Sequence, residues 1–360
     1  MDNLKRNIDK LPQLSGVYFF KDKLGYIIYI GKSKNLKKRV KQYFYKSKNH
    51  SPKIERMIPN IKKVDYKVTD TELEALVLES KLIKKYKPKY NSLLKNFKGY
   101  PYIKITKEVY PRLEITYNIS KDNAWYFGPY DKKNIVYEVV KSIEDLFPIR
   151  KCGKDINLSS CLYKDIGKCL APCVRENGKK YNEMINNIKK LITGEYDDLI
   201  DNIEIKMKKE AKKLNFEKAQ EYKNKMNILN HIIYKQKIVS KALTEEKNII
   251  IEETIREDIK IYFIIGGRIS DKLIIDNKNK KNITHILKYY VYKFKNQKKD
   301  DKDILPQEEI DEAQIIQNWV RTNAVCYIDI DGQSSTHEIV NKLYNKIIEI
   351  FKIKTERVVT

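Results

Sequence analysis

The sequence lacks any apolar run near the roughly 20 residues that a membrane-spanning helix needs. Its first eleven residues are charged and contain no apolar export signal. Cysteine is scarce, at five in 360 residues, which argues against a disulfide scaffold in a chain without such a signal. These absences predict a cytoplasmic protein with no membrane partner. The length allows a sizeable core and two or three domains.

Positive charge is concentrated at one end of the chain. The formal net charge is +25, and residues 1–100 hold 25 Lys/Arg against 9 Asp/Glu. A solvated lysine-rich surface would explain the preference for lysine, but not this concentration. Clustered cations release counterions from a phosphate backbone, so nucleic acid is the favoured partner. Aromatic residues that could stack on bases lie among the charges: Tyr43, Phe44, Tyr45, Tyr86, Tyr90, Phe97 and Tyr100.

A β-hairpin is predicted near the N-terminus. Residues 15–20 and 26–30 have strand character, and the polar connection between them ends in glycine. A turn centred in that connection would place Tyr18 directly opposite Tyr29 on one side of the sheet. The pair could serve packing alone or take part in chemistry.

A helix is predicted after the hairpin, with Ser33 as its N-cap. Apolar residues recur at every fourth position: Leu36, Val40 and Phe44. Lys32 directly precedes the helix, and Arg39 follows seven residues later, close to two full turns. Both cations can therefore lie along the same edge.

A second helix contains a carboxylate that its position does not explain. Thr71 and Glu74 form the pattern of a capping box, and the helix should end before Pro88. The neighbours of Glu79 at three and four residues on either side are all apolar: Ala75, Leu76, Leu82 and Ile83. A carboxylate on such a stripe needs a cation, which could be a Lys or Arg side chain or a metal ion.

The rest of the chain predicts an α+β protein. Short strands and a helix are expected over 100–150, and a helical hairpin over 177–237 with a break near 214–216. Strands are expected over 248–275 and 324–328, and helices over 308–320 and 336–352.

Four cysteines lie within 22 residues: Cys152, Cys161, Cys169 and Cys173. Four thiolates suit either tetrahedral Zn²⁺ or an iron–sulfur cluster, and the spacing C-x8-C-x7-C-x3-C does not choose between them. Cys326 is isolated and is expected in the core.

Several ordered motifs together resemble one family. Gly16-Val17-Tyr18 and Tyr29-Ile30-Gly31, followed by Lys32 and Arg39, resemble the signature of GIY-YIG nucleases. The resemblance extends to the UvrC family, the incision subunit of bacterial nucleotide excision repair, through EALVLE (74–79), PKYN (88–91), YPYIK (100–104) and YFGPY (126–130). It implies a small mixed α/β endonuclease domain over residues 1–100 and a connecting α+β region over 101–150.

The resemblance also implies a catalytic site. Glu79 corresponds to the ligand of a single Mg²⁺ or Mn²⁺ ion, Tyr18 and Tyr29 to the paired tyrosines, and Asn91 to the asparagine after the second helix. Lys32 and Arg39 correspond to phosphate-facing cations. Tyr29 is preferred over Tyr18 as the base, and the neighbouring cations and metal are expected to favour its phenolate.

The resemblance also implies a metal cofactor in one segment and a protein partner for another. GKCLAPC (167–173) resembles the UvrC cysteine motif, which implies a [4Fe–4S] cluster, with Zn²⁺ as the alternative, in a segment over 151–176. LNFEKA (214–219) resembles the UVR motif within the helical region 177–240 and implies UvrB as partner through a hairpin at about 200–235. The implied contact residues are Leu214, Phe216, Ala219 and Tyr222, whereas Lys223 replaces the family's arginine.

The implied function is the 3′ incision of damaged double-stranded DNA held by UvrB, with UvrA acting indirectly. Residues 245–360 resemble the start of the UvrC C-terminal half, but no RNase H-like nuclease or helix-hairpin-helix pair follows. The expectation is a shortened form similar to Cho, although the UVR hairpin departs from Cho. Two alternatives are a non-catalytic module that binds UvrB and DNA, and a standalone structure-specific nuclease.

Overall fold

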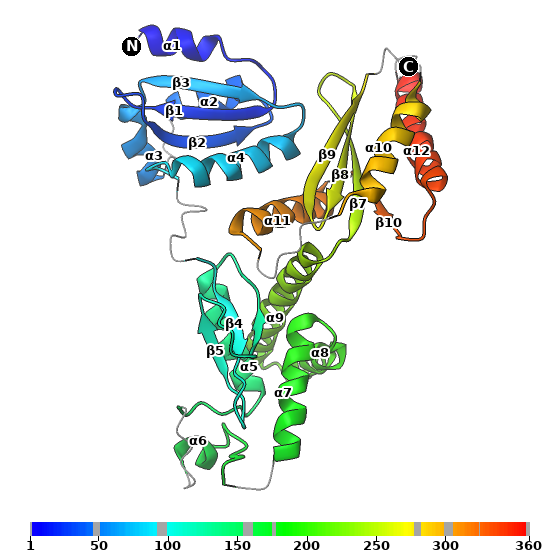
Figure 1. The fold of residues 1–360 in the computed structure, drawn as a ribbon. Coiled ribbons are helices and arrows are strands. Elements are labelled where there is room, and N and C mark those ends of the chain that lie inside the picture. Colours follow the sequence, from blue (N-terminus) through cyan, green and yellow to red (C-terminus); the bar gives the residue numbers. More distant parts are fainter. Residues whose placement is uncertain are drawn as a thin grey trace. The chain divides into compact units, whose positions relative to one another are not determined.

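The computed structural model describes residues 2–45, 51–91, 99–153, 161–174, 178–276, 282–298, 305–323 and 325–357. Phe97 and Ala324, which the sequence placed at a basic surface and in a strand, lie outside these ranges. The chain divides into two compact units (Figure 1). The first unit contains residues 1–96 and 241–360, and the second contains residues 97–240.

The N-terminal part of the first unit is a three-stranded antiparallel sheet between helices. The strands are β1 (Gly16–Lys21), β2 (Ile27–Ser33) and β3 (Lys63–Val68), in the order β2-β1-β3. The helices are α1 (Asp2–Asp9), α2 (Leu36–Phe44), α3 (Pro52–Met57) and α4 (Glu72–Tyr86), with a 3₁₀ turn over Ile58–Asn60. Tyr18 and Phe20 pack on one face of the sheet against α2, whereas Val17 and Ile30 pack on the other against α4. Side chains therefore alternate between the two helices along each strand.

The predicted register of the hairpin is wrong by two residues. Tyr18 lies opposite Gly31, and Tyr29 lies opposite Phe20. The connection between the strands is a turn closed by Asp22 and Tyr26, and a bulge follows Phe20, so the turn is not centred where its polar residues suggested. A shift of two residues preserves the face of each side chain, so both tyrosines still lie on the α2 side.

The helix starts differ in detail from the predictions. Asn35, not Ser33, caps α2, and its Oδ1 accepts a hydrogen bond from the Lys38 backbone N–H at 2.9 Å. The Ser33 hydroxyl instead accepts from the Asn35 N–H. Thr71 caps α4 as predicted, but the Glu74 carboxylate accepts from the N–H of Asp70. In a capping box the Glu74 carboxylate would accept from the N–H of Thr71 itself, so this bond is shifted by one residue.

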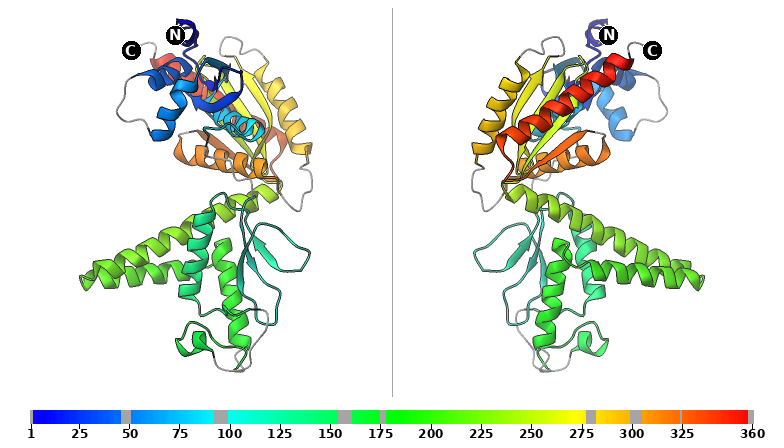
Figure 2. Two further views of the ribbon diagram at one scale, coloured as in Figure 1. Left: turned by 90° about the vertical axis from the view of Figure 1, so that its left-hand side faces the viewer. Right: turned by 90° about the vertical axis from the view of Figure 1, so that its right-hand side faces the viewer.

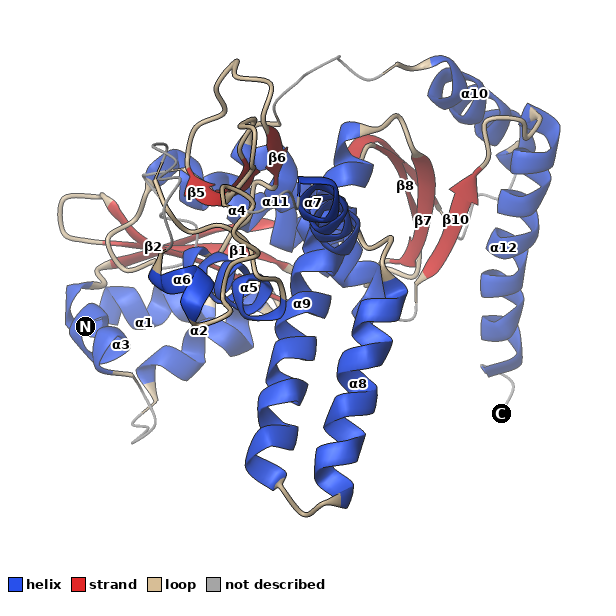
Figure 3. Ribbon diagram, turned by 90° about the horizontal axis from the view of Figure 1, so that it is seen from below, coloured by secondary structure: helices blue, strands red, loops and turns tan. Residues whose placement is uncertain are grey.

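The second unit combines a small sheet with a helical hairpin. Its strands are β4 (Tyr102–Ile105), β5 (Leu113–Thr116) and β6 (Trp125–Phe127), in the order β5-β4-β6. Its helices are α5 (Lys133–Leu146), α6 (Leu162–Asp165), α7 (Gly178–Thr193), α8 (Asp197–Lys212) and α9 (Phe216–Leu243). Buried aliphatic side chains of β4, α5, α7 and α9 form one core. Helices α8 and α9 run antiparallel from a tight turn in which Leu214 has φ +59° (Figure 3).

The C-terminal part of the first unit is a four-stranded antiparallel sheet in the order β10-β7-β8-β9. Its strands are β7 (Lys247–Glu253), β8 (Ile259–Ile265), β9 (Arg268–Ile275) and β10 (Cys326–Ile330). Helices α10 (Ile283–Asn296) and α12 (Thr336–Arg357) cover one face (Figure 2), and α11 (Gln307–Thr322) packs on the other. Helix α10 was not anticipated from the sequence. Cys326 is half-buried at the edge of this core, near its expected place.

No helix within the described ranges is both long enough and apolar enough to span a bilayer.

Candidate active site

Three tyrosines form a hydrogen-bonded cluster on the α2 side of the N-terminal sheet. The hydroxyls of Tyr18 and Tyr43 lie 2.8 Å apart, and the Tyr43 hydroxyl lies 3.5 Å from that of Tyr29. The Tyr18 and Tyr29 ring centroids are 6.2 Å apart. Tyr18 is 1% exposed, whereas Tyr29 is only half-buried. Tyr29 is therefore the phenol that solvent and a ligand can reach more easily.

Tyr43 is a member of this site that the sequence analysis missed. It appeared there only as one of several aromatics among charges, because the predicted stripe of α2 ran through Phe44. The structure buries Leu36, Val40 and Tyr43 instead. Leu36, Val40 and Tyr43 are spaced by four and then three residues, which fits the helical period as well as the predicted stripe does. This spacing could have identified Tyr43 as a buried residue.

Gly31 makes room for the Tyr18 side chain. A Cβ atom at position 31 would lie 2.3 Å from the Tyr18 hydroxyl oxygen and 2.4 Å from the adjoining ring carbon. Such a contact is far inside van der Waals distance, so the close approach of the ring to strand β2 requires glycine. Gly31, the third residue of the Tyr29-Ile30-Gly31 motif, thus leaves the space that the Tyr18 ring occupies.

Glu79 lies near these phenols, at the edge of the contact between α4 and the sheet. Its Oε1 accepts a hydrogen bond from the Lys32 backbone N–H at 3.0 Å. Burial raises the pKa of this carboxyl group, and the charges of Lys32 and Arg39 oppose that shift. The Glu79 charge in turn contributes to the raised pKa of Tyr29. Within the described chain Glu79 forms no ion pair with a Lys or Arg, so the salt-bridge alternative is not observed.

The two predicted cations are arranged differently. The Arg39 guanidinium lies 5.4 Å from the ring centroid of Tyr43 and donates to Gln42. The Lys32 Nζ lies 2.5 Å from Oε1 of Glu72, whose Oε2 lies 2.9 Å from the Nζ of Lys34. Arg39 therefore belongs to the phenol cluster, whereas the Lys32 ammonium is held by a carboxylate.

The two cations do not by themselves favour a phenolate. Burial raises the pKa of both Tyr18 and Tyr29 above the ordinary value for tyrosine, and the neighbouring Tyr43 raises them further. Arg39 acts in the expected direction, but its effect is smaller than that of burial. Burial outweighs these two cations because the rings are desolvated and the Lys32 ammonium is engaged by Glu72.

Asn91 bonds to backbone rather than to the phenols. Its Oδ1 accepts from the Ile30 N–H at 2.9 Å and its Nδ2 donates to the Ile30 carbonyl at 2.8 Å. The side chain thus pairs with strand β2 as a neighbouring strand would, at the residue between Tyr29 and Gly31. Asn91 therefore fixes the backbone of β2 beside Tyr29.

The cysteine segment shows proximity but no complete ligand set. The thiols of Cys161, Cys152 and Cys173 contribute to the raised pKa of Cys169, after the larger effect of burial. The Cys169 Sγ accepts from the Ala171 N–H at 3.3 Å. Within the described ranges no three His, Cys, Asp or Glu side chains converge closely enough to bind a metal ion. The four thiols therefore lie near one another without forming a closed ligand set among the described residues.

The turn between α8 and α9 exposes apolar side chains. Leu214 is 75% exposed and Phe216 is 65% exposed. Ala219 is buried, and Tyr222 packs against the core of the second unit. Of the four predicted contact residues, Leu214 and Phe216 are thus largely exposed, Tyr222 is partly exposed and Ala219 is buried.

Comparisons with known proteins identify two regions. Residues 14–92 match the UvrC-like GIY-YIG domain, and residues 100–191 match the UvrC/Cho excinuclease middle domain. UvrABC system protein C of Acetivibrio thermocellus is 37% identical over 368 residues, covering 98% of this chain and 59% of that protein. The same protein of Clostridium botulinum (strain Loch Maree) is 36% identical over 369 residues, covering 98% and 60%. The chain thus spans about three fifths of the length of these relatives.

A solved structure also resembles the N-terminal region. It is the GIY-YIG N-terminal endonuclease domain of UvrC from Thermotoga maritima, bound to its catalytic divalent cation, magnesium. It is 38% identical to this chain, covers 25% of this chain and 98% of its own, and has a TM-score of 0.23.

Proposed function

We propose that this chain, which is 36–37% identical to UvrABC system protein C over 98% of its length, is a metal-dependent DNA endonuclease that makes the 3′ incision beside a lesion in nucleotide excision repair. One observation carries the proposal. The Glu79 carboxylate is partly desolvated, is anchored by the Lys32 N–H and forms no ion pair with a described Lys or Arg, beside three linked phenols. A carboxylate in that setting is suited to hold a divalent cation against a phosphate.

Each residue has a proposed part in phosphodiester hydrolysis. A Mg²⁺ or Mn²⁺ ion bound by Glu79 would polarise the phosphate and stabilise the leaving oxygen. Arg39 offsets charge that develops on the phosphoryl oxygens. Lys32 contributes in the same way once a phosphate competes with Glu72 for its ammonium. Asn91 and Gly31 fix strand β2, and with it Tyr29 and the Tyr18 ring.

Tyr29 is the proposed general base because it is the more accessible of the two predicted tyrosines. A neutral phenol cannot take the proton of water, so Tyr29 must first lose its own. Arg39 favours that loss, and burial opposes it. The Tyr43 hydroxyl donates to Tyr29 but, like burial, raises the pKa of Tyr29, so Arg39 is the side chain that favours the phenolate.

The test of the site is the variant Glu79→Gln. We expect it to lower Mg²⁺-dependent nicking of a UvrB-bound damaged duplex by at least about 100-fold, because a neutral amide is a weak ligand for a hard cation. Binding of the duplex should be nearly unchanged. Glu55→Gln, an exposed acid on α3 in the same domain, is the control and should nick normally. Undiminished nicking by Glu79→Gln would refute the assignment, and a wild-type protein that binds without nicking would favour the non-catalytic module.

We propose UvrB as a partner through the α8–α9 turn. The supporting observation is the pair of exposed apolar side chains, Leu214 and Phe216, on an otherwise lysine-rich hairpin. Replacement of both by Ser should weaken UvrB capture in a pull-down by at least about tenfold, since apolar anchors dominate such contacts. Leu162→Ser, a 70% exposed control on α6, should have no effect. Equal capture by both variants would favour a standalone nuclease.

We also propose that Cys152, Cys161, Cys169 and Cys173 hold a [4Fe–4S] cluster, with Zn²⁺ as the alternative. Support comes from four cysteines within 22 residues and from the effect of three of them, Cys152, Cys161 and Cys173, on the pKa of Cys169. Metal content and visible absorption of protein purified without oxygen distinguish the two metals. A protein that carries neither iron nor zinc, and is unchanged by Cys173→Ser, would contradict both.

A further inference from the structure

Helix α10 has one face in the core and an opposite face of lysine and tyrosine. The helix lies beside α12 on one face of the sheet (Figure 2). Its buried side chains pack there: Ile283, Leu287, Val291 and Phe294. Lys288, Tyr289 and Tyr292 lie on the exposed side of the helix. Tyr289 is 62% exposed and Tyr292 is 66% exposed. Two exposed aromatic rings one helical turn apart do not contribute to the core, and such neighbouring rings indicate a binding surface.

Positive and negative residues are unevenly distributed along residues 241–360. Residues 241–360 contain 21 Lys/Arg and 20 Asp/Glu, so the segment is nearly neutral. Within it, the sequence stretch 277–299 contains eight lysines and no acidic residue. A general preference for lysine would not remove every acid from one stretch of a neutral segment. The concentration matches an anionic partner.

Some of the polar groups on α10 are available to such a partner. Lys293 pairs with Asp271 at 2.6 Å, and Lys295 donates to the Ser334 carbonyl at 2.6 Å. Lys288 has no ion pair with any described residue. The hydroxyls of Tyr289 and Tyr292 likewise form no hydrogen bond within the described chain. The Tyr289 ring meets the edge of the Tyr290 ring, with centroids 5.5 Å apart, but most of its surface stays exposed. One unpaired cation and two exposed rings thus lie on the same side of the helix.

We propose that the exposed face of α10 binds an unpaired nucleic-acid strand. Lys288 contacts backbone phosphates, and Tyr289 and Tyr292 stack on successive bases. A duplex would use the lysine but would leave the rings unstacked, because its bases are paired and stacked within the helix. A lipid surface fits less well, since the exposed aliphatic side chain on the described part of α10 is Ile286, too little apolar area for a helix that lies in a membrane.

The proposal concerns a surface separate from the tyrosine cluster of the N-terminal sheet, and it does not depend on nuclease activity. Binding is measured by fluorescence anisotropy of a labelled oligothymidine of about 20 nucleotides, on the full chain and in EDTA. Tyr289→Ala/Tyr292→Ala should bind this strand about tenfold or more weakly, and bind a duplex within about twofold of wild type. Lys288→Gln should weaken both and reduce the salt dependence.

Controls separate this surface from general basicity. Tyr137→Ala removes a 49% exposed tyrosine from α5 and should bind the single strand as wild type does. A strand containing 2-aminopurine should change its fluorescence with wild type and much less with the double tyrosine variant, which reports stacking directly. Unchanged single-strand affinity in the double variant would overturn the proposal. So would a loss confined to phosphatidylserine vesicles, which would identify a membrane surface instead.

Discussion

Gly31 shows, at the scale of one residue, how a missing side chain organises the site. The Tyr18 ring occupies the space that any Cβ at position 31 would need, and its hydroxyl bonds to Tyr43 from there. The glycine is therefore required by a close approach, since its φ is not positive.

Gly31→Ala is the corresponding prediction. The added methyl must displace Tyr18 or the strand, so we expect a loss of about 1–3 kcal/mol in the free energy of unfolding, as for overpacking in a core. Nicking should fall as well, because the Tyr18–Tyr43 hydrogen bond is broken. Urea unfolding and the nicking assay measure the two effects. Gly332→Ala, where a Cβ meets open space, is the control, and equal behaviour of the two variants would contradict this account.

Helix α4 is the element that joins the two halves of the first unit. One side of it packs under the N-terminal sheet through Ala75 and Ile83. Its other side buries Leu73 and Val77 against β8 and α11. Both sides of the helix are therefore committed to packing, and Glu79 is held at the edge of the first contact. An element fixed in this way supplies the rigid support that a metal ligand needs.

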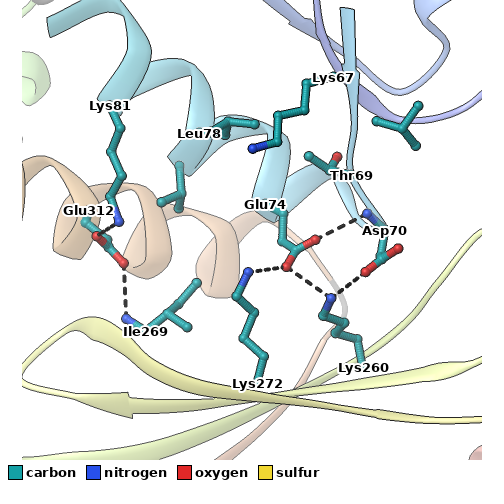
Figure 4. Close-up of a pocket in the computed structure, with 12 residues that line it drawn as sticks. Lys67, Thr69, Asp70, Glu74, Leu78, Lys81, Lys260, Ile269, Lys272 and Glu312 are labelled. Atoms are coloured by element: carbon teal, nitrogen blue, oxygen red, sulfur yellow. Dashed lines mark hydrogen bonds and ion pairs between the residues drawn. The ribbon is translucent and has the colours of Figure 1, made fainter. Parts of the chain in front are cut away.

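Glu74 is the polar counterpart of that packing. Its Oε1 lies 2.7 Å from the Nζ of Lys272 and 3.1 Å from that of Lys260, in a cavity of about 380 Å³ (Figure 4). Lys260 also pairs with Asp70, and Lys81 pairs with Glu312 across the same cavity. These contacts connect α4 with strands β8 and β9 and with α11.

We predict that Glu74→Gln lowers the unfolding free energy of the first unit by about 1–3 kcal/mol, because Lys260 is buried and would lose one of its two carboxylate partners. Glu349→Gln breaks the exposed pair with Lys346 and should leave the unfolding free energy nearly unchanged. Thermal and urea unfolding compare the two. A larger effect at Glu349 would show that burial does not set the strength of these pairs.

For the whole molecule, Glu252 makes stability depend on pH. Burial raises the pKa of this carboxyl group to about 7, with Glu74 and Glu72 adding to the shift and Trp319 and Thr71 opposing it. Unfolded, the group would titrate near 4.5. Between these values the folded state keeps a proton that the unfolded state releases. Stability should therefore decrease as pH rises from about 4.5 to 7 and remain lower above that range.

The expected change in the free energy of unfolding from this group is about 3 kcal/mol across the range. Glu252→Gln should remove most of the pH dependence and stabilise the first unit at pH 8. Trp319 donates to Glu252 and is one of two tryptophans, so its fluorescence in a Trp125→Phe background follows the first unit. An unchanged pH profile in Glu252→Gln would show that other groups carry the titration.

Local pattern was sufficient for much of this protein. The hairpin strands, the Thr71 cap and end of α4, the break near Leu214 and most C-terminal elements follow from residue order, because periodicity, caps and turn residues act within a few positions of the chain. The position of Glu79 on an apolar stripe also identified a carboxylate in need of a cation. Each of these features is a relation between near neighbours in sequence.

Tertiary structure decided what depends on contact between distant residues. In the folded chain the Tyr43 hydroxyl bonds to those of Tyr18 and Tyr29. The Asn91 amide bonds to the backbone of Ile30, and the Lys32 ammonium pairs with Glu72. The pKa of each buried phenol follows from desolvation, which no local pattern records. Strand register, burial and charge pairing arise only when distant segments come into contact. Residue order therefore determined the helices and strands, whereas the tertiary structure determined the partners and the pKa values of their side chains.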